Sequence, residues 1–143
     1  MFVKQISLFL ENRSGRLHAA TAALAAKQIN IHALSLADTA DFGILRLIVD
    51  DTDAATQALR AAGFTVVVND VVAVGVEDKP GGLDAILGLL EARGINVEYM
   101  YAFSSVATGD AALVFRFEDN NAAVKTLMQA DVGVLDNVAV FGQ

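Results

Sequence analysis

Two short turns carry the residue types best suited to binding a small charged molecule. One spans Leu8 to Leu17, L-F-L-E-N-R-S-G-R-L, and the other spans Val74 to Leu83, V-G-V-E-D-K-P-G-G-L. In each, an apolar strand ends in polar residues and a glycine opens a helix. Backbone N–H groups and the positive end of the helix dipole meet there, which suits a carboxylate. Asn12 or Asp78 could accept a bond from an ammonium group, so a zwitterion would satisfy both ends.

A simpler reading is that these residues only make the turn. Strand-to-helix turns need the backbone freedom of glycine and an Asn or Ser to cap the helix. Gly81 follows Gly15 by 66 positions, and a duplicated fold duplicates its turns. The repetition therefore does not separate a binding role from a purely structural one.

Hydrophobic periodicity indicates which elements position the first turn. We expect strands at 3–10, 30–37, 42–49 and 64–68, a helix from Leu17 to Ala26 capped near Ser14, and a helix from Ala54 to Ala62. Asp50 to Asp53 read as helix-capping residues rather than as a cation site. Alternation in the second strand places Ile31, Ala33 and Ser35 on one face. The order β-α-β-β-α-β is the ferredoxin-like pattern.

The second half of the chain repeats this pattern at an offset of 66 to 68 residues. Asn69-Asp70 is expected to interrupt the strand structure. We place the boundary between two domains, 1–69 and 70–143, at this point. The repeated strands are predicted at 71–76, 97–103, 112–119 and 134–141, with helices at 83–90 and 120–128. The fold class is therefore α+β, with a ferredoxin-like βαββαβ unit repeated twice.

Composition excludes several classes of function. The chain has 143 residues, a net charge of −7 and no cysteine. Without a Lys/Arg cluster it should not bind nucleic acid, and without cysteine it has no disulfide or thiolate metal site. No segment approaches the roughly 18 apolar residues of a membrane span, and we do not expect the first residues to form a signal peptide. We expect a cytoplasmic protein with no metal, no cofactor and no membrane partner.

The turn E-N-(R/K)-(S/P)-G-x-L, the β-α-β-β-α-β order and the I-N-(I/V) entry to the second strand resemble the ACT domain. That family comprises small-molecule-sensing modules of amino-acid metabolism, and the resemblance covers the chain as two tandem copies. It implies two units side by side, forming an eight-stranded antiparallel sheet with helices on one face. It also implies an amino acid bound between the turn of one unit and the second strand of the other.

Carried onto matching positions, the resemblance implies a set of ligand-binding residues. They are Asn12, Ser14, Gly15, Arg16 and Leu17 in the first turn, Asp78, Pro80, Gly81, Gly82 and Leu83 in the second turn, and Asn30, Ser35, Tyr99 and Tyr101 in the second strands. Ser14 stands where the family usually has Pro, and Asp78 where Asn is commoner, so the two sites should differ. The first turn, facing Tyr99 and Tyr101, is the expected site. Alternatively, these tyrosines pack with Phe103 under the helices.

The function expected from these residues is non-catalytic sensing of a free amino acid, which regulates amino-acid metabolism. A regulatory subunit docked on a separate biosynthetic enzyme differs only in its partner. A small ferredoxin-like enzyme is the other alternative, but it would need a nucleophile or an acid–base pair. The chain has two histidines: we expect His18 to be solvated and His32 to lie at an edge or interface. Strands apolar on both faces, at 42–49 and 66–74, predict a homodimer.

Overall fold

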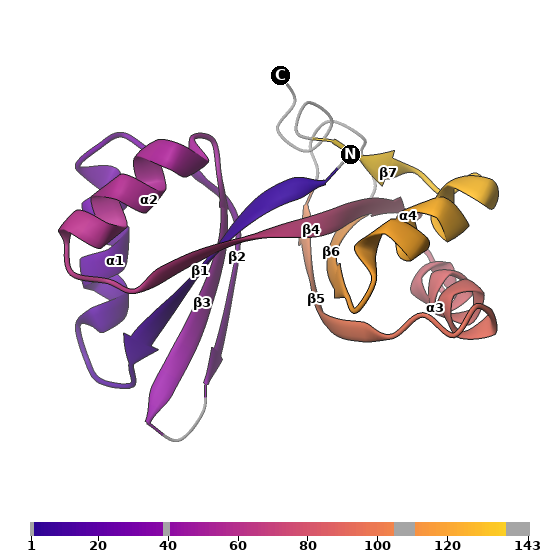
Figure 1. The fold of residues 1–143 in the computed structure, drawn as a ribbon, viewed down its shortest axis with the longest axis horizontal. Coiled ribbons are helices and arrows are strands. Elements are labelled where there is room, and N and C mark those ends of the chain that lie inside the picture. The colour runs from indigo at the N-terminus through magenta and orange to yellow at the C-terminus, as the bar shows by residue number, and fades with distance from the viewer. Residues whose placement is uncertain (1, 39–40, 105–110, 137–143) are drawn as a thin grey trace. The chain divides into compact units, whose positions relative to one another are not determined.

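The computed structural model describes residues 2–38, 41–104 and 111–136. These residues form two compact units. The first is Lys4–Asn69, and the second begins at Asp70 and includes the first residues of the chain. Each unit has two helices on one face of its sheet (Figure 1). Within the described residues, no helix has the length and apolar character that crossing a membrane requires.

The first unit has the predicted ferredoxin-like order. Its elements are β1 (Val3–Glu11), α1 (Arg16–Ala25), β2 (Ile31–Asp38), β3 (Phe42–Val49), α2 (Thr52–Ala61) and the first part of β4 (Val66–Val76). The strands lie in the order β2-β3-β1-β4, and β3 is antiparallel to both of its neighbours. Alternate residues of β1 and β3, including Leu8 and Leu47, pack with Leu24 of α1 and Leu59 of α2 in one buried core.

The second unit repeats this order. It comprises the second part of β4, α3 (Gly82–Ala92), β5 (Val97–Ser104), β6 (Ala111–Phe117), α4 (Asn120–Gln129) and β7 (Val134–Leu135). Strand β4 pairs with β6 and β7, and β6 also pairs with β5, all antiparallel. Phe115 and Phe117 of β6 pack with Leu90 of α3 and Leu127 of α4 in a second core. The tandem ferredoxin-like fold class is therefore confirmed. The predicted continuation of the last strand beyond residue 136 lies outside the described residues.

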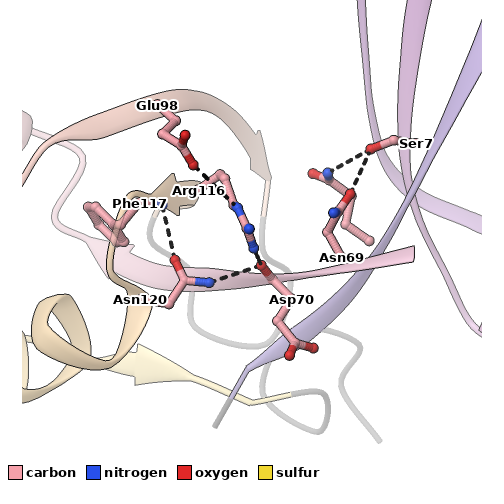
Figure 2. A network of polar contacts seen from close by, with 8 residues as sticks. Ser7, Asn69, Asp70, Glu98, Arg116, Phe117 and Asn120 are labelled. Carbon is pink, nitrogen blue, oxygen red and sulfur yellow. Dashed lines mark hydrogen bonds and ion pairs between the residues drawn. The ribbon is translucent and has the colours of Figure 1, made fainter. Parts of the chain in front are cut away.

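The predicted interruption of strand structure at Asn69-Asp70 is wrong, because β4 runs continuously from Val66 to Val76. Side chains hold the two polar residues in the extended conformation (Figure 2). Ser7 Oγ donates to Asn69 Oδ1 at 3.2 Å, while Arg116 Nη1 and Asn120 Nδ2 donate to the Asp70 carbonyl at 2.8 and 3.0 Å. The last strand of one repeat and the first of the next are thus one strand. The described residues accordingly form seven strands, where the resemblance implied eight.

The predicted alternation in β2 is also wrong at its start. Ile31 lies opposite Val49 while Ala33 lies opposite Ile48, so His32 is the extra residue of a β-bulge. A bulge changes which side chains share a face. Ile31 therefore lies on the helix-covered face with Leu34, and Ala33 lies on the other face.

The same bulge recurs in β5. Val97 lies opposite Phe117 and Tyr99 lies opposite Arg116, so Glu98 is the extra residue. Because Phe117 belongs to the helix-covered core, the partner of Arg116 faces the other way. Tyr99 and, two residues on, Tyr101 therefore lie on the face without helices. The alternative that these tyrosines pack under the helices is wrong.

Candidate functional site

The two candidate turns have nearly the same backbone. Gly15 and Gly81 both have positive φ, +90° and +86°, in the left-handed region that favours glycine. Before each glycine, a backbone hydrogen bond joins the cationic residue to the glutamate two positions earlier. Arg13 N donates to Glu11 O at 2.8 Å, and Lys79 N donates to Glu77 O at 2.9 Å. The carbonyl of each glycine accepts the first backbone hydrogen bond of the following helix, so each turn leads directly into a helix.

The helices that follow these turns lack a side-chain cap, unlike the other two helices. Predicted capping by Ser14 is wrong: the N-cap of α1 is Gly15, that of α3 is Gly81, and neither makes a side-chain hydrogen bond. By contrast, Asp51 and Asp119 accept from backbone N–H groups at the starts of α2 and α4, at 3.0 Å each. An aspartate carboxylate therefore caps α2 and α4, whereas the N-cap residues of α1 and α3 are glycines, which have no side chain to accept from the first N–H groups of the helix.

In the first turn, Glu11 is surrounded by two arginines. Its carboxylate lies 3.0 Å from Arg13 Nε and 4.0 Å from Arg16 Nε. The Arg16 guanidinium lies over the ring of Phe64, 4.6 Å from its centroid, and this cation–π contact fixes its position. The Nε atom of Arg16 is shielded from water and makes no hydrogen bond to the described residues. The first turn therefore holds a positioned cation with unused donor capacity beside an uncapped helix.

In the second turn, the cation Lys79 is already paired with a carboxylate. Lys79 Nζ lies 2.6 Å from the Glu77 carboxylate, and both side chains are largely exposed. This hydrogen bond and the opposite charge lower the pKa of Glu77 and raise the pKa of Lys79. Gly82 stands where the first repeat has Arg16, so the second turn lacks the counterpart of that guanidinium. The two turns share the left-handed glycine and the preceding hydrogen bond, and they differ in charge. The predicted difference between the two binding sites stays a prediction.

In the first unit, the predicted residues of the turn lie together, and the predicted residues of the second strand lie apart from them. Asn30 exchanges hydrogen bonds with Asp50 at 3.2 Å, at the end of the sheet where β2 begins. The first turn is at the opposite end, since Glu11 lies beside Phe42 at the start of β3. Ser35 lies opposite Arg46 on the face without helices. A combined site of one repeat's turn and the other's second strand stays a prediction.

The two histidines lie apart in the first unit. His18 is exposed in the first turns of α1, and His32 is the half-buried bulge residue of β2. Across residues 2–38, 41–104 and 111–136, no three His, Asp or Glu side chains lie close enough to hold a metal ion.

No role was predicted from the sequence for three residues that contact the cationic side chains of the turns. Glu11 and Glu77 pair with the cations of their own turns, and the repeated E-x-(R/K) spacing was the available signal. Phe64 lies beneath Arg16 although it is 48 positions further along the chain. No local pattern in the sequence connects those two residues.

Comparisons with known proteins agree with this geometry. A family model described as "ACT domain pair" matches residues 1–140. Protein BT0572 from Bacteroides thetaiotaomicron has a crystal structure with a TM-score of 0.92 and 40% identity, covering 100% of this chain and 98% of that one. The regulatory subunit of aspartate kinase from Thermus thermophilus has a TM-score of 0.63 and 20% identity, covering 89% and 91% of the two chains. No curated protein matches this sequence.

Proposed function

Because this chain belongs to the ACT domain pair family, we propose that it is a non-catalytic sensor that binds a free amino acid and regulates amino-acid metabolism. The observation that carries the proposal is the contrast between helix starts. Aspartates cap α2 and α4, whereas α1 and α3 follow a left-handed glycine without a side-chain cap. The fold shared with regulatory subunits of aspartate kinase is compatible with this role.

We place the preferred site at the first turn. The ligand carboxylate would accept from N–H groups at the start of α1 and from Arg16, whose guanidinium the Phe64 ring holds in place. The ammonium group would bond to Asn12. The other residues of this site, Ser14, Gly15 and Leu17, would contact the ligand through backbone atoms or side-chain surface. The second turn, with Gly82 in place of Arg16, would bind more weakly.

A thermal-shift screen of the twenty amino acids tests this function. A ligand that binds only the folded chain stabilises it by RT ln(1 + [L]/Kd), about 2.7 kcal/mol at a hundredfold excess over Kd. For a chain of this size we expect one amino acid, or a few related ones, to raise the melting temperature by about 5–10 °C. If all twenty leave the melting temperature unchanged at 10 mM (about a hundredfold excess for a Kd near 0.1 mM), the sensing function is refuted.

Substituting a charged residue for Gly15 tests whether the amino acid binds at the first turn. A side chain at this position meets no atom within 4 Å, and Asp and Asn tolerate positive φ better than most residues. Gly15→Asp adds a negative charge where the ligand carboxylate would lie, so we expect it to abolish the thermal shift. Gly15→Asn has the same shape without the charge and should keep part of it. An unchanged shift in Gly15→Asp would assign binding to the second turn, where Gly81→Asp would then abolish it.

We also propose that two chains associate through the helix-free face of the first unit. Phe9 and Phe42 are 47% and 53% exposed there, on neighbouring strands. Burying two adjacent aromatic rings favours association. Sedimentation at micromolar concentration should give the mass of a dimer, and Phe9→Asp should give a monomer. Dissociation by Leu34→Asp instead would assign the interface to the edge of β2. Amino-acid binding would regulate metabolism by changing this association or by changing the docking of the chain on a separate enzyme.

A further inference from the structure

An apolar groove on the second unit is unrelated to either candidate turn. It has a volume of about 640 Å³ and lies between α4 and the first residues of the chain. Its lining residues are Phe2, Asn121, Val124, Lys125, Met128 and Gln129. Met128 is 50% exposed, although methionine is usually buried. The five residues from α4 are spaced three or four positions apart, or adjacent, so they form one face of the helix.

The fold itself does not require an apolar surface here. Helix α2 is the counterpart of α4 in the first repeat, 68 positions earlier. Where α4 has Val124, Lys125 and Met128, α2 has Thr56, Gln57 and Arg60. The same structural element therefore forms in the first unit with polar residues on this face. Apolar residues on this helix face are therefore specific to the second repeat. The fold does not require them, so their exposure indicates a binding role.

The size of the groove favours a small molecule over a protein. Its volume falls within the roughly 300–1,000 Å³ of small-molecule sites. From Asn121 to Gln129, α4 advances only about 12 Å, at about 1.5 Å per residue. A stable protein interface uses about 20–30 residues on each side, whereas six line this groove. The charge of the lining also favours an anionic ligand. Among the described residues that line the groove, Lys125 alone is ionisable, within a chain of net charge −7.

We propose that this groove binds a small amphipathic monocarboxylate. Its apolar body would lie against Phe2, Val124 and Met128, and its carboxylate would pair with Lys125. The side-chain amides of Asn121 and Gln129, which also line the groove, could donate further hydrogen bonds to it. This site is separate from the amino-acid site and does not depend on it.

Titration of the full chain, labelled with ¹³C in its methionine methyl groups, tests the proposal. The probe is 4-phenylbutyrate, and its neutral analogue 4-phenylbutanol is the matched control. The Met128 methyl signal should shift saturably with the acid, while that of Met100, which packs against the second core, should stay in place. Because Lys125 is exposed to solvent, we expect the alcohol to bind about twofold to fivefold more weakly.

Two substitutions borrow the residues of the first repeat, where the fold accepts them. Lys125→Gln should remove the preference for the acid, and Val124→Thr should weaken the binding of acid and alcohol alike, as measured by calorimetry. No saturable shift of Met128, or equal affinity for acid and alcohol, would overturn the proposal. Broadening of the Met128 signal that disappears on dilution without any probe would show that a second copy covers the groove, and would also overturn it. If no amino acid shifts the melting temperature but the groove still binds 4-phenylbutyrate, only the proposed sensing function is refuted.

Discussion

Gly82→Ala is expected to lower the free energy of unfolding by about 2–3 kcal/mol, close to the upper range for overpacking a tightly packed position. The backbone carbonyl oxygen of Glu77 approaches Gly82 so closely that an added Cβ would lie inside van der Waals contact with it. The Cβ would also lie 3.1 Å from Val76 Cγ1. Neither a backbone carbonyl nor the buried end of β4 can move aside cheaply, so the whole turn would have to shift.

The matched control is Gly88→Ala in the same helix. A Cβ at Gly88 meets no atom within 4 Å, and alanine in a helix interior is favoured over glycine by about 0.8–1.0 kcal/mol. The same chemical change should therefore stabilise the protein at position 88 and destabilise it at position 82, as measured by urea unfolding. If Gly82→Ala unfolds at the wild-type urea concentration, then the approach of Glu77 is not a constraint on the second turn.

The local parts of the fold could be predicted from the sequence because their causes are local. The D-D-T-D run ahead of α2 predicted a capped helix, and Asp51 provides that cap. The repeat of turns and helices followed from matching short patterns at a constant offset. These predictions needed only residues within one or two turns of each other.

The predictions that are wrong have causes far away in the sequence. Asn69-Asp70 has the local character of a turn, but Ser7, Arg116 and Asn120 hold it extended through hydrogen bonds across 46 to 62 positions. Strict alternation in β2 and β5 also gave no sign of a bulge. Only pairing with the neighbouring strand shows that an extra residue is accommodated there, and so which way Tyr99 faces.

The same limit applies to the candidate site. Its turn residues lie in one stretch of sequence, so they could be recognised together. The cation–π contact that positions Arg16 joins two elements separated by most of the first unit, and short-range spacing cannot predict it. The difference between the two turns was predicted from Ser14 and Asp78. The two turns also differ at the matching positions Arg16 and Gly82, and the expected difference in ligand binding stays a prediction.

Phe115→Ala is expected to lower the free energy of unfolding of the second unit by about 3–5 kcal/mol, as for other buried phenylalanines. Its ring is fully buried and stacks on that of Phe117, with centroids 5.1 Å apart. Phe115→Leu is the control because the first repeat has Leu47 at the matching position. It keeps most of the apolar volume and should cost about 1–1.5 kcal/mol.

Hydrogen exchange then shows whether the two units are separately stable, as we propose for 1–69 and 70–143. The two cores have no buried residue in common, although β4 contributes to both. Phe115→Ala should accelerate exchange in α3 and α4 by at least about a hundredfold, since about 1.4 kcal/mol corresponds to a factor of ten. Amides of α1 and α2 should change by less than about threefold, because local opening of one unit leaves the other folded. Equal acceleration in all four helices would mean that the continuous strand β4 joins the repeats into one cooperative domain.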